Sequence, residues 1–490
     1  MSKPVVRSTN PEIILDQHSL MPLYRQLYVR FRAEILAGQL KTGTRLPSTR
    51  ALASELGVSR NTTAMAYELL LLEGYFESKV GDGTRVAYQQ PQPKTPDSNS
   101  PTTGLSARSQ LLLNTPYPGE LYANPQSAST RLFRAGQPDV SFFPFKTWAG
   151  LVAKHANRSL PGASHYQQAQ GYLPLREAIA THIGITRGVH CSPDQIILTA
   201  GSQGALDLVA RVLLDPGDLV WVEDPGYLGA RGALLAAGAS LVPVAVDEEG
   251  LEVDTGRKLC PAARLAVVTP SHQFPTGVTM SLSRRLALLE WARASQSWII
   301  EDDYDSEYRF SGRPLEALQG LDNNGRVIYI GTFSKVLFPS LRLGYLIVPT
   351  KLLNGFIATR RFIDVHIPLL EQMALADFIT EGHFARHLRK MRLLYLERRD
   401  ALVEALKQEL DDMEVTIPEA GMHLVAWLPP GMNGRVTAQL ARLQELYLVL
   451  ISQSCQKPFP REGLMLGFAN NTPEELRAGV KKLALAIRSG

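Results

Sequence analysis

Gly331-Thr-Phe-Ser-Lys-Val-Leu-Phe-Pro-Ser-Leu-Arg-Leu-Gly-Tyr345 follows an apolar, β-branched run at residues 327–330 that predicts a buried strand. Lys335 lies just after that strand, in a glycine-containing loop that also holds hydroxyl side chains and Arg342. A lysine held away from water has a lowered pKa, and its neutral amine can form a Schiff base. Hydroxyls and a guanidinium at this spacing suit a phosphate group. A solvated lysine and arginine beside a loop would explain the same residues, and taken alone the stretch favours that explanation.

Helical patterns and β-branched runs alternate from about residue 130 onward, which predicts an α/β fold with a mostly parallel sheet. The run at 195–198 leads into Thr199-Ala-Gly-Ser-Gln-Gly204. These small residues either cap a helix or leave its first N–H groups free to bind an anion. The run at 298–300 ends in the acidic sequence Glu301-Asp-Asp-Tyr-Asp-Ser-Glu307. Because α/β sheets bind ligands at the carboxyl ends of their strands, we expect one of these carboxylates to be functional.

Two further predicted strands end in aromatic or polar residues. The run at 219–223 ends in Asp224-Pro-Gly-Tyr227, where an aromatic ring could stack on a flat ligand or simply pack. The run at 265–268 leads to Thr269-Pro-Ser-His-Gln-Phe-Pro-Thr-Gly277. Together the strand ends supply what pyridoxal phosphate (PLP) requires: a lysine, a carboxylate, a phenol, a stacking ring and a phosphate cup.

The N-terminal residues follow a different pattern. Helical spacing predicts helices at residues 22–37, 49–56 and about 60–73, and Ser59 is a good N-cap for the third. Two short helices joined by a glycine-containing turn form a helix-turn-helix, whose second helix would face the major groove. A hairpin across Gly81-Asp-Gly83 would then be a wing. The alternative is a small helical module with a solvated basic face.

The segment between these regions is poor in apolar residues. Residues 89–109 are mostly Gln, Pro, Ser, Thr and Lys, which cannot bury enough surface to order themselves. Leu111-Leu-Leu-Asn114 could begin to dock on the region C-terminal to it. We therefore expect a DNA-binding head at 1–88, a flexible linker at 89–129 and a body at 130–490, since 490 residues exceed one core.

Composition narrows the class of protein. Apolar residues make up 45% and charged residues 20%, and the net charge of +4 is too small to indicate nucleic-acid binding alone. No apolar run is long enough to span a membrane, and the N-terminus lacks a signal-peptide pattern. Three scattered cysteines suit a reducing compartment and are not spaced for a metal. We expect a cytoplasmic protein without a metal site.

Two motifs in the head are specific. They read Leu46-Pro-Ser-Thr-Arg-Ala-Leu-Ala-Ser-Glu-Leu-Gly-Val-Ser-Arg-Asn-Thr62 and Gly81-Asp-Gly-Thr84. With them, residues 20–88 resemble the winged-helix DNA-binding domain of GntR-type bacterial regulators. The resemblance implies that double-stranded promoter DNA is contacted by Arg50, Ser59, Arg60 and Thr62, with Gly83 at the wing tip. Arg45 and Lys79 are either phosphate contacts or solvated surface.

The body carries three more motifs: Gly331-Thr-Phe-Ser-Lys335, Ser271-His-Gln-Phe-Pro-Thr-Gly277 and Glu301-Asp-Asp-Tyr-Asp-Ser-Glu-Tyr-Arg-Phe310. Residues 130–490 resemble a fold-type I, aspartate aminotransferase-like PLP domain with a smaller C-terminal α+β subdomain. The fused chain resembles the MocR/GabR group of transcriptional regulators.

This resemblance implies a role for each matched residue. Lys335 is the Schiff-base lysine, and Asp302 is the partner of the pyridine nitrogen, with Asp303 as the alternative. Tyr304 bonds the ring oxygen, and Tyr227 stacks on the ring. The residues that hold the phosphate are Ser202, Gln203, Thr332 and Arg342. Tyr166 reaches the phosphate site of a neighbouring subunit, which implies a homodimer.

The chain departs from the aminotransferase pattern at two places. Aminotransferases carry Asn-Pro-x-Gly, but Phe274 stands where the asparagine is expected, so either His272 or Gln273 contacts the ring oxygen or that contact is absent. The enzymes also place an arginine for the substrate carboxylate on a C-terminal strand. Here that position falls on Leu464 or Met465.

The missing arginine bears on function. Arg461 precedes the strand and is not a matched position, so a bidentate grip on an amino-acid carboxylate is lost. We therefore expect a dimeric, PLP-dependent transcriptional regulator that senses an amine-bearing effector, or PLP itself, through a Lys335 aldimine. Such a protein would have at most weak or partial transaminase activity. The alternatives are a working aminotransferase with a fused DNA-binding domain, and a body kept only for dimerisation.

Overall fold

The chain divides into two compact units, Met1–Gly104 and Leu105–Gly490. The structure, a computed structural model, describes residues 15–17, 19, 21–79, 82–87, 104–113, 115, 132–157, 166–310 and 315–488. Most of the expected linker and Gly81 of the expected wing lie outside the described residues.

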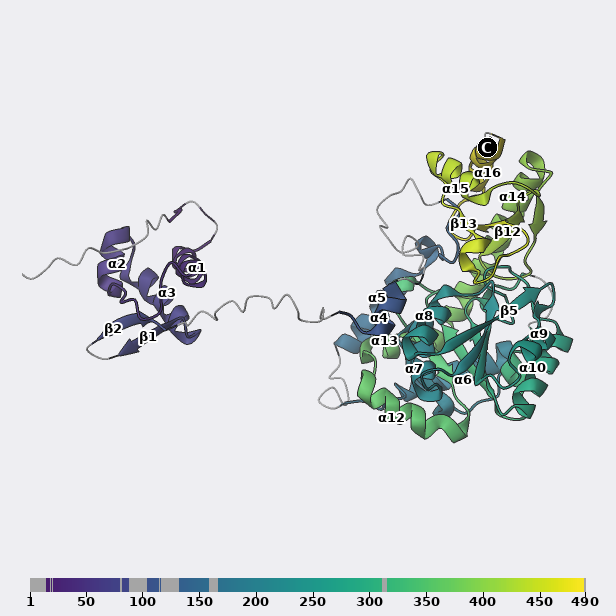
Figure 1. Cartoon of the computed structure of the whole chain (residues 1–490), viewed down its shortest axis with the longest axis horizontal. Coiled ribbons are helices and arrows are strands. Elements are labelled where there is room, and N and C mark those ends of the chain that lie inside the picture. The colour runs from purple at the N-terminus through teal and green to yellow at the C-terminus, as the bar shows by residue number, and fades with distance from the viewer. Residues whose placement is uncertain are drawn as a thin grey trace, which may run out of the picture. The chain divides into compact units, whose positions relative to one another are not determined.

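The first unit is a three-helix domain with a small hairpin (Figure 1). Its elements are α1 (Leu23–Leu36), α2 (Thr49–Leu56), α3 (Arg60–Leu72), β1 (Phe76–Lys79) and β2 (Gly83–Val86), the two strands being antiparallel. Three rings fill the core: Phe31, Tyr67 and Phe76 meet edge to face, with centroids 5.1–5.9 Å apart. The Ser59 hydroxyl accepts from the backbone N–H of Thr62 and so starts α3 where the sequence predicts it.

The second unit is built on an eight-stranded sheet in the order β3-β10-β9-β8-β7-β4-β5-β6. The strands are β3 (Ile196–Thr199), β4 (Leu219–Asp224), β5 (Ser240–Asp247), β6 (Gly250–Leu251), β7 (Leu265–Val268), β8 (Trp298–Asp303), β9 (Val327–Thr332) and β10 (Gly344–Ile347). β10 runs antiparallel to β3 and β9, and β6 runs antiparallel to β5, whereas the strands between are parallel.

Helices cover both faces of this sheet, which explains why its strands are almost continuously apolar. On β4, Val220 and Val222 face α7 (Gly201–Leu213) and α8 (Leu228–Ala237) in one buried cluster. Trp221 faces the opposite cluster, where it stacks on Trp291 of α10 (Leu282–Ala294) at 3.9 Å. The helices α9 (Val253–Leu259) and α11 (Leu318–Leu321) lie with α10 on this second face.

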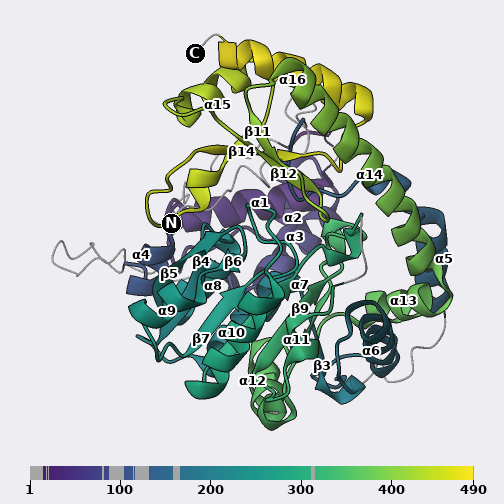
Figure 2. The same ribbon diagram turned by 90° about the vertical axis from the view of Figure 1, so that its right-hand side faces the viewer.

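A smaller antiparallel sheet completes the unit. Its order is β11 (Glu414–Thr416), β12 (His423–Trp427), β14 (Gly463–Gly467) and β13 (Val449–Leu450). Figure 2 shows α14 (His383–Glu409) and α16 (Pro473–Arg488) packed together beside it, near α15 (Gly434–Leu443). The winged helix-turn-helix, the mostly parallel α/β sheet and the small C-terminal sheet confirm the expected fold class.

One helix lies within the segment expected to be a linker. α4 (Ala107–Leu113) packs on α8, and Arg108 donates to the carbonyl of Ala236 at 3.4 Å. The division into 1–88, 89–129 and 130–490 remains a prediction.

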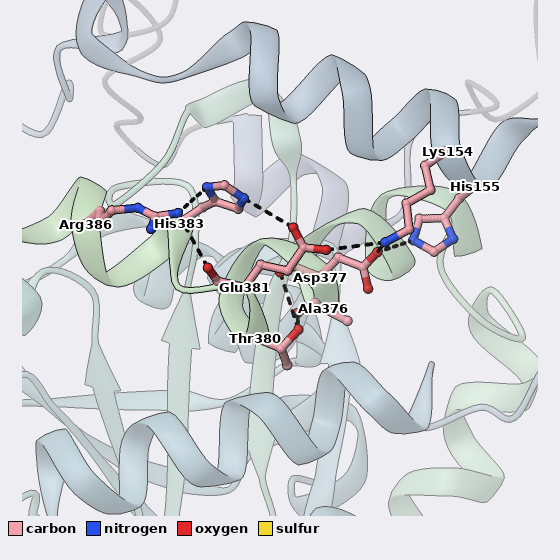
Figure 3. Close-up of polar contacts among 8 residues, drawn as sticks. All are labelled: Lys154, His155, Ala376, Asp377, Thr380, Glu381, His383 and Arg386. Atoms are coloured by element: carbon pink, nitrogen blue, oxygen red, sulfur yellow. Dashed lines mark hydrogen bonds and ion pairs between the residues drawn. The ribbon is translucent and has the colours of Figure 1, made fainter.

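A network of ion pairs joins three helices away from the sheet (Figure 3). Asp377 of α13 (Leu369–Thr380) accepts from Lys154 and His155 of α5 (Phe145–Ala156), at 2.7 and 2.8 Å. Glu381 bridges Lys154 to His383 at the start of α14. These side chains therefore connect α5 to the end of α13 and the start of α14. The unit also contains α6 (Leu173–Arg187), which packs on α13, and α12 (Leu353–Ile363), which packs on α7.

Among the helices of the described segments, none is long and apolar enough to cross a membrane. No group of three His, Cys, Asp or Glu side chains within the described ranges could hold a metal ion.

Candidate functional site

A cavity of about 100 Å³ lies between the carboxyl ends of the large-sheet strands and the small sheet. Five of the residues predicted from the sequence to bind a cofactor line it, namely Ser202, Tyr227, Asp302, Tyr304 and Lys335. Strand-end residues of β8 and β9 therefore meet at one edge, as the parallel arrangement predicts.

Lys335 projects into this cavity from the loop after β9. Its Nζ donates to the carbonyl of Gly136 at 2.7 Å. Burial lowers the pKa of Lys335, although the charges of Asp305 and Asp302 act in the opposite direction. Gly136 has a φ of 70°, and a Cβ there would lie 3.1 Å from Nζ, so the backbone approaches the amine closely. Sequence reasoning missed Gly136, which is far from the lysine along the chain.

The three acids at the end of β8 have three different environments. Glu301 accepts from the backbone N–H groups of Leu318 and Gln319, both at 2.9 Å. Asp303 accepts from the Arg187 guanidinium at 2.9 Å and from the Tyr329 hydroxyl at 2.6 Å.

Asp302 points the other way, because successive side chains of a strand face opposite sides of the sheet. It lines the cavity, and its Oδ1 is buried without a hydrogen-bond partner among the described residues. Burial, followed by the charge of Asp303, raises the pKa of Asp302 to about 7. An unpaired buried carboxyl oxygen costs free energy unless a ligand satisfies it. Of the two aspartates left open by the sequence, Asp302 is the one available to a ligand.

Tyr304 belongs to a buried chain of polar groups. Its hydroxyl lies 3.0 Å from Nδ1 of His272, and the same Nδ1 lies 3.0 Å from Oδ2 of Asp305. Burial raises the pKa of Asp305, and the charge of His272 acts in the opposite direction. With Asp305 ionised, its carboxylate can only accept, so Nδ1 then carries the proton and the phenol oxygen of Tyr304 also faces that N–H. The phenol proton is then directed elsewhere, and Tyr304 lines the cavity. Gly421 makes room for this chain, because a Cβ there would lie 2.1 Å from the His272 ring.

His272 and Gln273, the two candidates for a ring-oxygen contact, both lie behind the cavity wall. His272 supports Tyr304, and Gln273 donates to Glu223 at 3.1 Å and to the carbonyl of Pro225 at 2.9 Å. Phe274 itself lines the cavity.

The predicted phosphate residues gather around the N-terminus of α7. Arg342, with a φ of 52°, donates to the carbonyl of Ala200 at 2.8 Å, and its guanidinium lies against Gly201. Thr332 accepts from the N–H of Ser334 at 3.2 Å. Two buried polar atoms, Ser334 Oγ and Gln203 Oε1, have no hydrogen-bond partner within the described part of the chain. Ser334 was not singled out from the sequence, although it stands inside the Gly331–Lys335 motif.

Tyr227 and Tyr166 differ in their surroundings. The Tyr227 ring meets Phe274 edge-on, with centroids 5.7 Å apart, and folds over Gly229, where a Cβ would lie 2.4 Å from the ring. Tyr166 is 85% exposed and does not line the cavity.

The two candidates for the carboxylate position have different surroundings. Met465 lines the cavity, together with His423 of β12 and Val449 of β13. Leu464 is buried in the core of the small sheet instead. Arg461 pairs with Glu414, and its guanidinium lies 5.4 Å from the centre of the Trp427 ring.

In the first unit, the predicted DNA contacts lie in α2, at the start of α3 and on the hairpin. Arg50 and Arg60 are exposed, and the Ser59 and Thr62 hydroxyls lie 2.9 Å apart. The Arg45 guanidinium lies about 3.5 Å from the position of a Cβ on Gly83, so the structure brings this arginine to the wing.

Comparisons with known proteins agree with both units. The family described as aminotransferase class I and II matches residues 135–483, and the family of bacterial regulatory proteins, gntR family, matches residues 23–86. The chain is 44% identical to the probable rhizopine catabolism regulatory protein MocR of Rhizobium meliloti, over 97% of this chain and 96% of that protein. It is 37% identical to the HTH-type transcriptional regulator YhdI of Bacillus subtilis, over 96% and 97% of the two chains.

A solved structure shows the same body fold. An archaeal alanine:glyoxylate aminotransferase superposes with a TM-score of 0.71 and 31% identity, over 79% of this chain and 98% of that one. The chain therefore belongs to the MocR-type family of GntR transcriptional regulators, in which a helix-turn-helix head is fused to an aminotransferase-like domain.

Proposed function

We propose that this regulator binds promoter DNA through its winged helix, holds PLP in the cavity and senses an amine-bearing effector, or PLP itself, at Lys335. The observation that carries the proposal is the pair formed by Lys335 and Asp302. A partly desolvated amine and a buried, unsatisfied carboxyl oxygen line the same cavity. These are the two groups that PLP needs at opposite ends of its ring system.

When bound, PLP supplies an aldehyde that condenses with amines and a pyridine ring that withdraws electrons. Lys335 would provide the resident amine, and Asp302 would keep the pyridine nitrogen protonated. Tyr227 would stack on the ring, and the unpartnered Ser334 hydroxyl would join the predicted phosphate residues. Those residues are Ser202, Gln203, Thr332 and Arg342.

The Asp305–His272–Tyr304 chain would set the proton at the ring oxygen. Because the His272 N–H faces both Asp305 and the phenol oxygen, the Tyr304 proton is free to be donated to a ligand. Tyr304 would therefore contribute the hydrogen bond to the ring oxygen, while His272 acts behind it. Phe274 occupies the place of the usual asparagine without adding a polar contact.

We infer that an effector acts by replacing Lys335 at the cofactor. Release of the lysine would restore its free amine, which in this structure donates to the Gly136 carbonyl, and so would change the contact between Lys335 and the segment before α5. An effector shifts a conformational equilibrium only by its differential affinity for the two states, so DNA binding must differ between them. A homodimer, with Tyr166 completing the neighbouring phosphate site, remains part of the proposal, and the exposure of this tyrosine supports it.

A second candidate function is an aminotransferase that carries a DNA-binding head. The likeness to the archaeal aminotransferase and the complete lysine–aspartate pair favour it. Met465 disfavours it, because a thioether cannot bind an α-carboxylate as a guanidinium does. At most a partial transamination is expected.

Replacing Lys335 with alanine tests the sensing step. The variant is expected to lose the visible absorption band of the PLP–lysine adduct and, with it, effector-dependent DNA binding. Lys482→Ala, on the outer helix α16, is the matched control and should keep both. If Lys335→Ala still changed its DNA binding in response to amines, the sensing proposal would be wrong.

Replacing Arg60 with alanine tests whether the first unit binds DNA while the second unit binds the cofactor. Loss of a base or phosphate contact is expected to cost about 1–3 kcal/mol, or roughly 5- to 150-fold in Kd. The measurement is fluorescence anisotropy on a duplex selected from random DNA by the native protein. Arg32→Ala, on α1, is the control, because Arg32 donates to the Tyr75 hydroxyl. A changed PLP spectrum in Arg60→Ala would contradict the proposal.

A further inference from the structure

One side of the cavity is built by parts of the body that the Lys335–Asp302 pair does not use. Six residues line it, and they come from the segment before α5, the loop after β7 and the region of the small sheet. They are Gln137, Phe274, His423, Val449, Gln453 and Met465. A ligand whose amine replaced Lys335 at the cofactor would extend its remaining groups toward this wall.

This wall offers no fixed positive charge. Among the described residues that line the cavity, Lys335 is the only lysine or arginine, and the proposed function assigns its amine to the cofactor. His423 Nε2 donates to the carbonyl of Pro275 at 3.1 Å, and burial lowers the pKa of His423 to about 3, so it is neutral near pH 7. The wall therefore combines apolar side chains with neutral amides.

The two arginines near the small sheet, Arg461 and Arg134, do not compensate. Arg461 pairs with Glu414 on the outside of the small sheet, and the Arg134 guanidinium lies 5.3 Å from the centre of the Tyr447 ring. Neither belongs to the described lining of the cavity. Both guanidiniums are thus held at other contacts.

Acidic side chains lie close to the wall. Asp302 lines the cavity, and Glu223 and Asp305 are close enough that their charges add to the rise in its pKa. A carboxylate on the ligand would be desolvated beside Met465 without a paired cation on the wall, and any ionised acid nearby would repel it. A hydroxyl or amide would instead find the side-chain amides of Gln137 and Gln453.

We propose that the effector is a primary amine that lacks a carboxylate and bears neutral hydrogen-bonding groups, such as an amino alcohol or polyhydroxylated amine. This inference rests on the proposed function, since it assumes that the amine condenses with PLP at Lys335. It narrows the effector class by the chemistry of the wall opposite that lysine.

The test compares pairs of molecules that differ in a carboxylate. PLP-loaded protein is titrated with ethanolamine against glycine and with 2-amino-1,3-propanediol against serine, following the visible absorption band. Each amino alcohol is expected to give its half-maximal shift at a concentration lower by about tenfold or more than the matching amino acid. Equal or tighter responses to the amino acids would overturn the inference.

A substitution at the wall makes the test sharper. Met465→Arg restores a guanidinium, whose bidentate bonds should reverse the preference toward glycine and serine by about tenfold. Leu443→Arg, at an exposed position of α15, adds the same charge outside the cavity and should leave the preference unaltered. If Met465→Arg takes up PLP and the preference does not move, the inference fails.

The outcomes separate the two proposals. If Met465→Arg does not fold, the titrations of the native protein still decide the question. Failure of the native protein to form any PLP band refutes the proposed function and this inference with it. A normal PLP band that responds equally to both members of each pair refutes the inference alone.

Discussion

Replacing Arg187 with methionine is expected to destabilise the second unit strongly. Arg187 ends α6, and its Nε lies 2.9 Å from Oδ2 of Asp303, with side chains only 7% and 1% exposed. The same guanidinium also donates to the Ser271 hydroxyl and the Leu315 carbonyl. Methionine keeps most of the apolar stem but leaves Asp303 as a buried charge without its cation.

The expected loss is about 3–5 kcal/mol in the free energy of unfolding, the usual cost of removing one partner from a buried ion pair. Urea unfolding followed by tryptophan fluorescence measures it. All five tryptophans lie in the Leu105–Gly490 unit, so the signal reports on that unit and not on the head.

Arg211→Met is the matched control. Its ion pair with Asp207 is as short, at 2.7 Å, but the side chains are 55% and 34% exposed, so a loss of less than about 1 kcal/mol is expected. The double variant Arg187→Met/Asp303→Asn should regain part of the loss, because it removes the stranded charge. If Arg187→Met is no less stable than Arg211→Met, burial does not determine how much the Arg187–Asp303 pair contributes to the free energy of unfolding.

Three further outcomes are expected. Gly229→Ala should weaken PLP uptake about tenfold or more, because its methyl group would displace the Tyr227 ring; Gly232→Ala, whose Cβ meets no described atom within 4 Å, should not. The free energy of unfolding is expected to decrease as pH falls from about 6.5 toward 3, and His423→Gln should make this decrease smaller. The folded pKa of about 3 lies below that of free histidine, so the unfolded chain binds more protons in this window. Ser59→Ala should cost the first unit about 1 kcal/mol in thermal or urea unfolding, because it removes the cap of α3.

Local pattern predicted much of this molecule. α2 and α3 begin directly after their serine caps, Ser48 and Ser59, and α3 ends at Leu72, one residue before the expected Glu73. The strands of the large sheet are apolar because both of their faces are covered, and their carboxyl ends carry the predicted cofactor residues.

What could not be predicted depends on partners distant in sequence. Asp302 and Asp303 look alike in the sequence, and distant partners distinguish them: Asp303 pairs with the buried Arg187, 116 positions away, and with Tyr329. The same holds for Gly136 beside Lys335 and for Met465 rather than Leu464 at the wall. α4 lies within the segment expected to be linker and packs on α8, although Leu111, Leu112 and Leu113 stay exposed.

The cavity is assembled from segments spread along most of the body, from Ala135 to Met465. A molecule held there contacts the large sheet, the small sheet and the segment before the first body helix together, an arrangement that the unfolded chain does not offer. Such a ligand stabilises the native state by RT ln(1 + [L]/Kd), or about 2.7 kcal/mol at a hundredfold excess over Kd. The supply of cofactor in the cell would then govern how much regulator escapes degradation, and hence its abundance as well as its state.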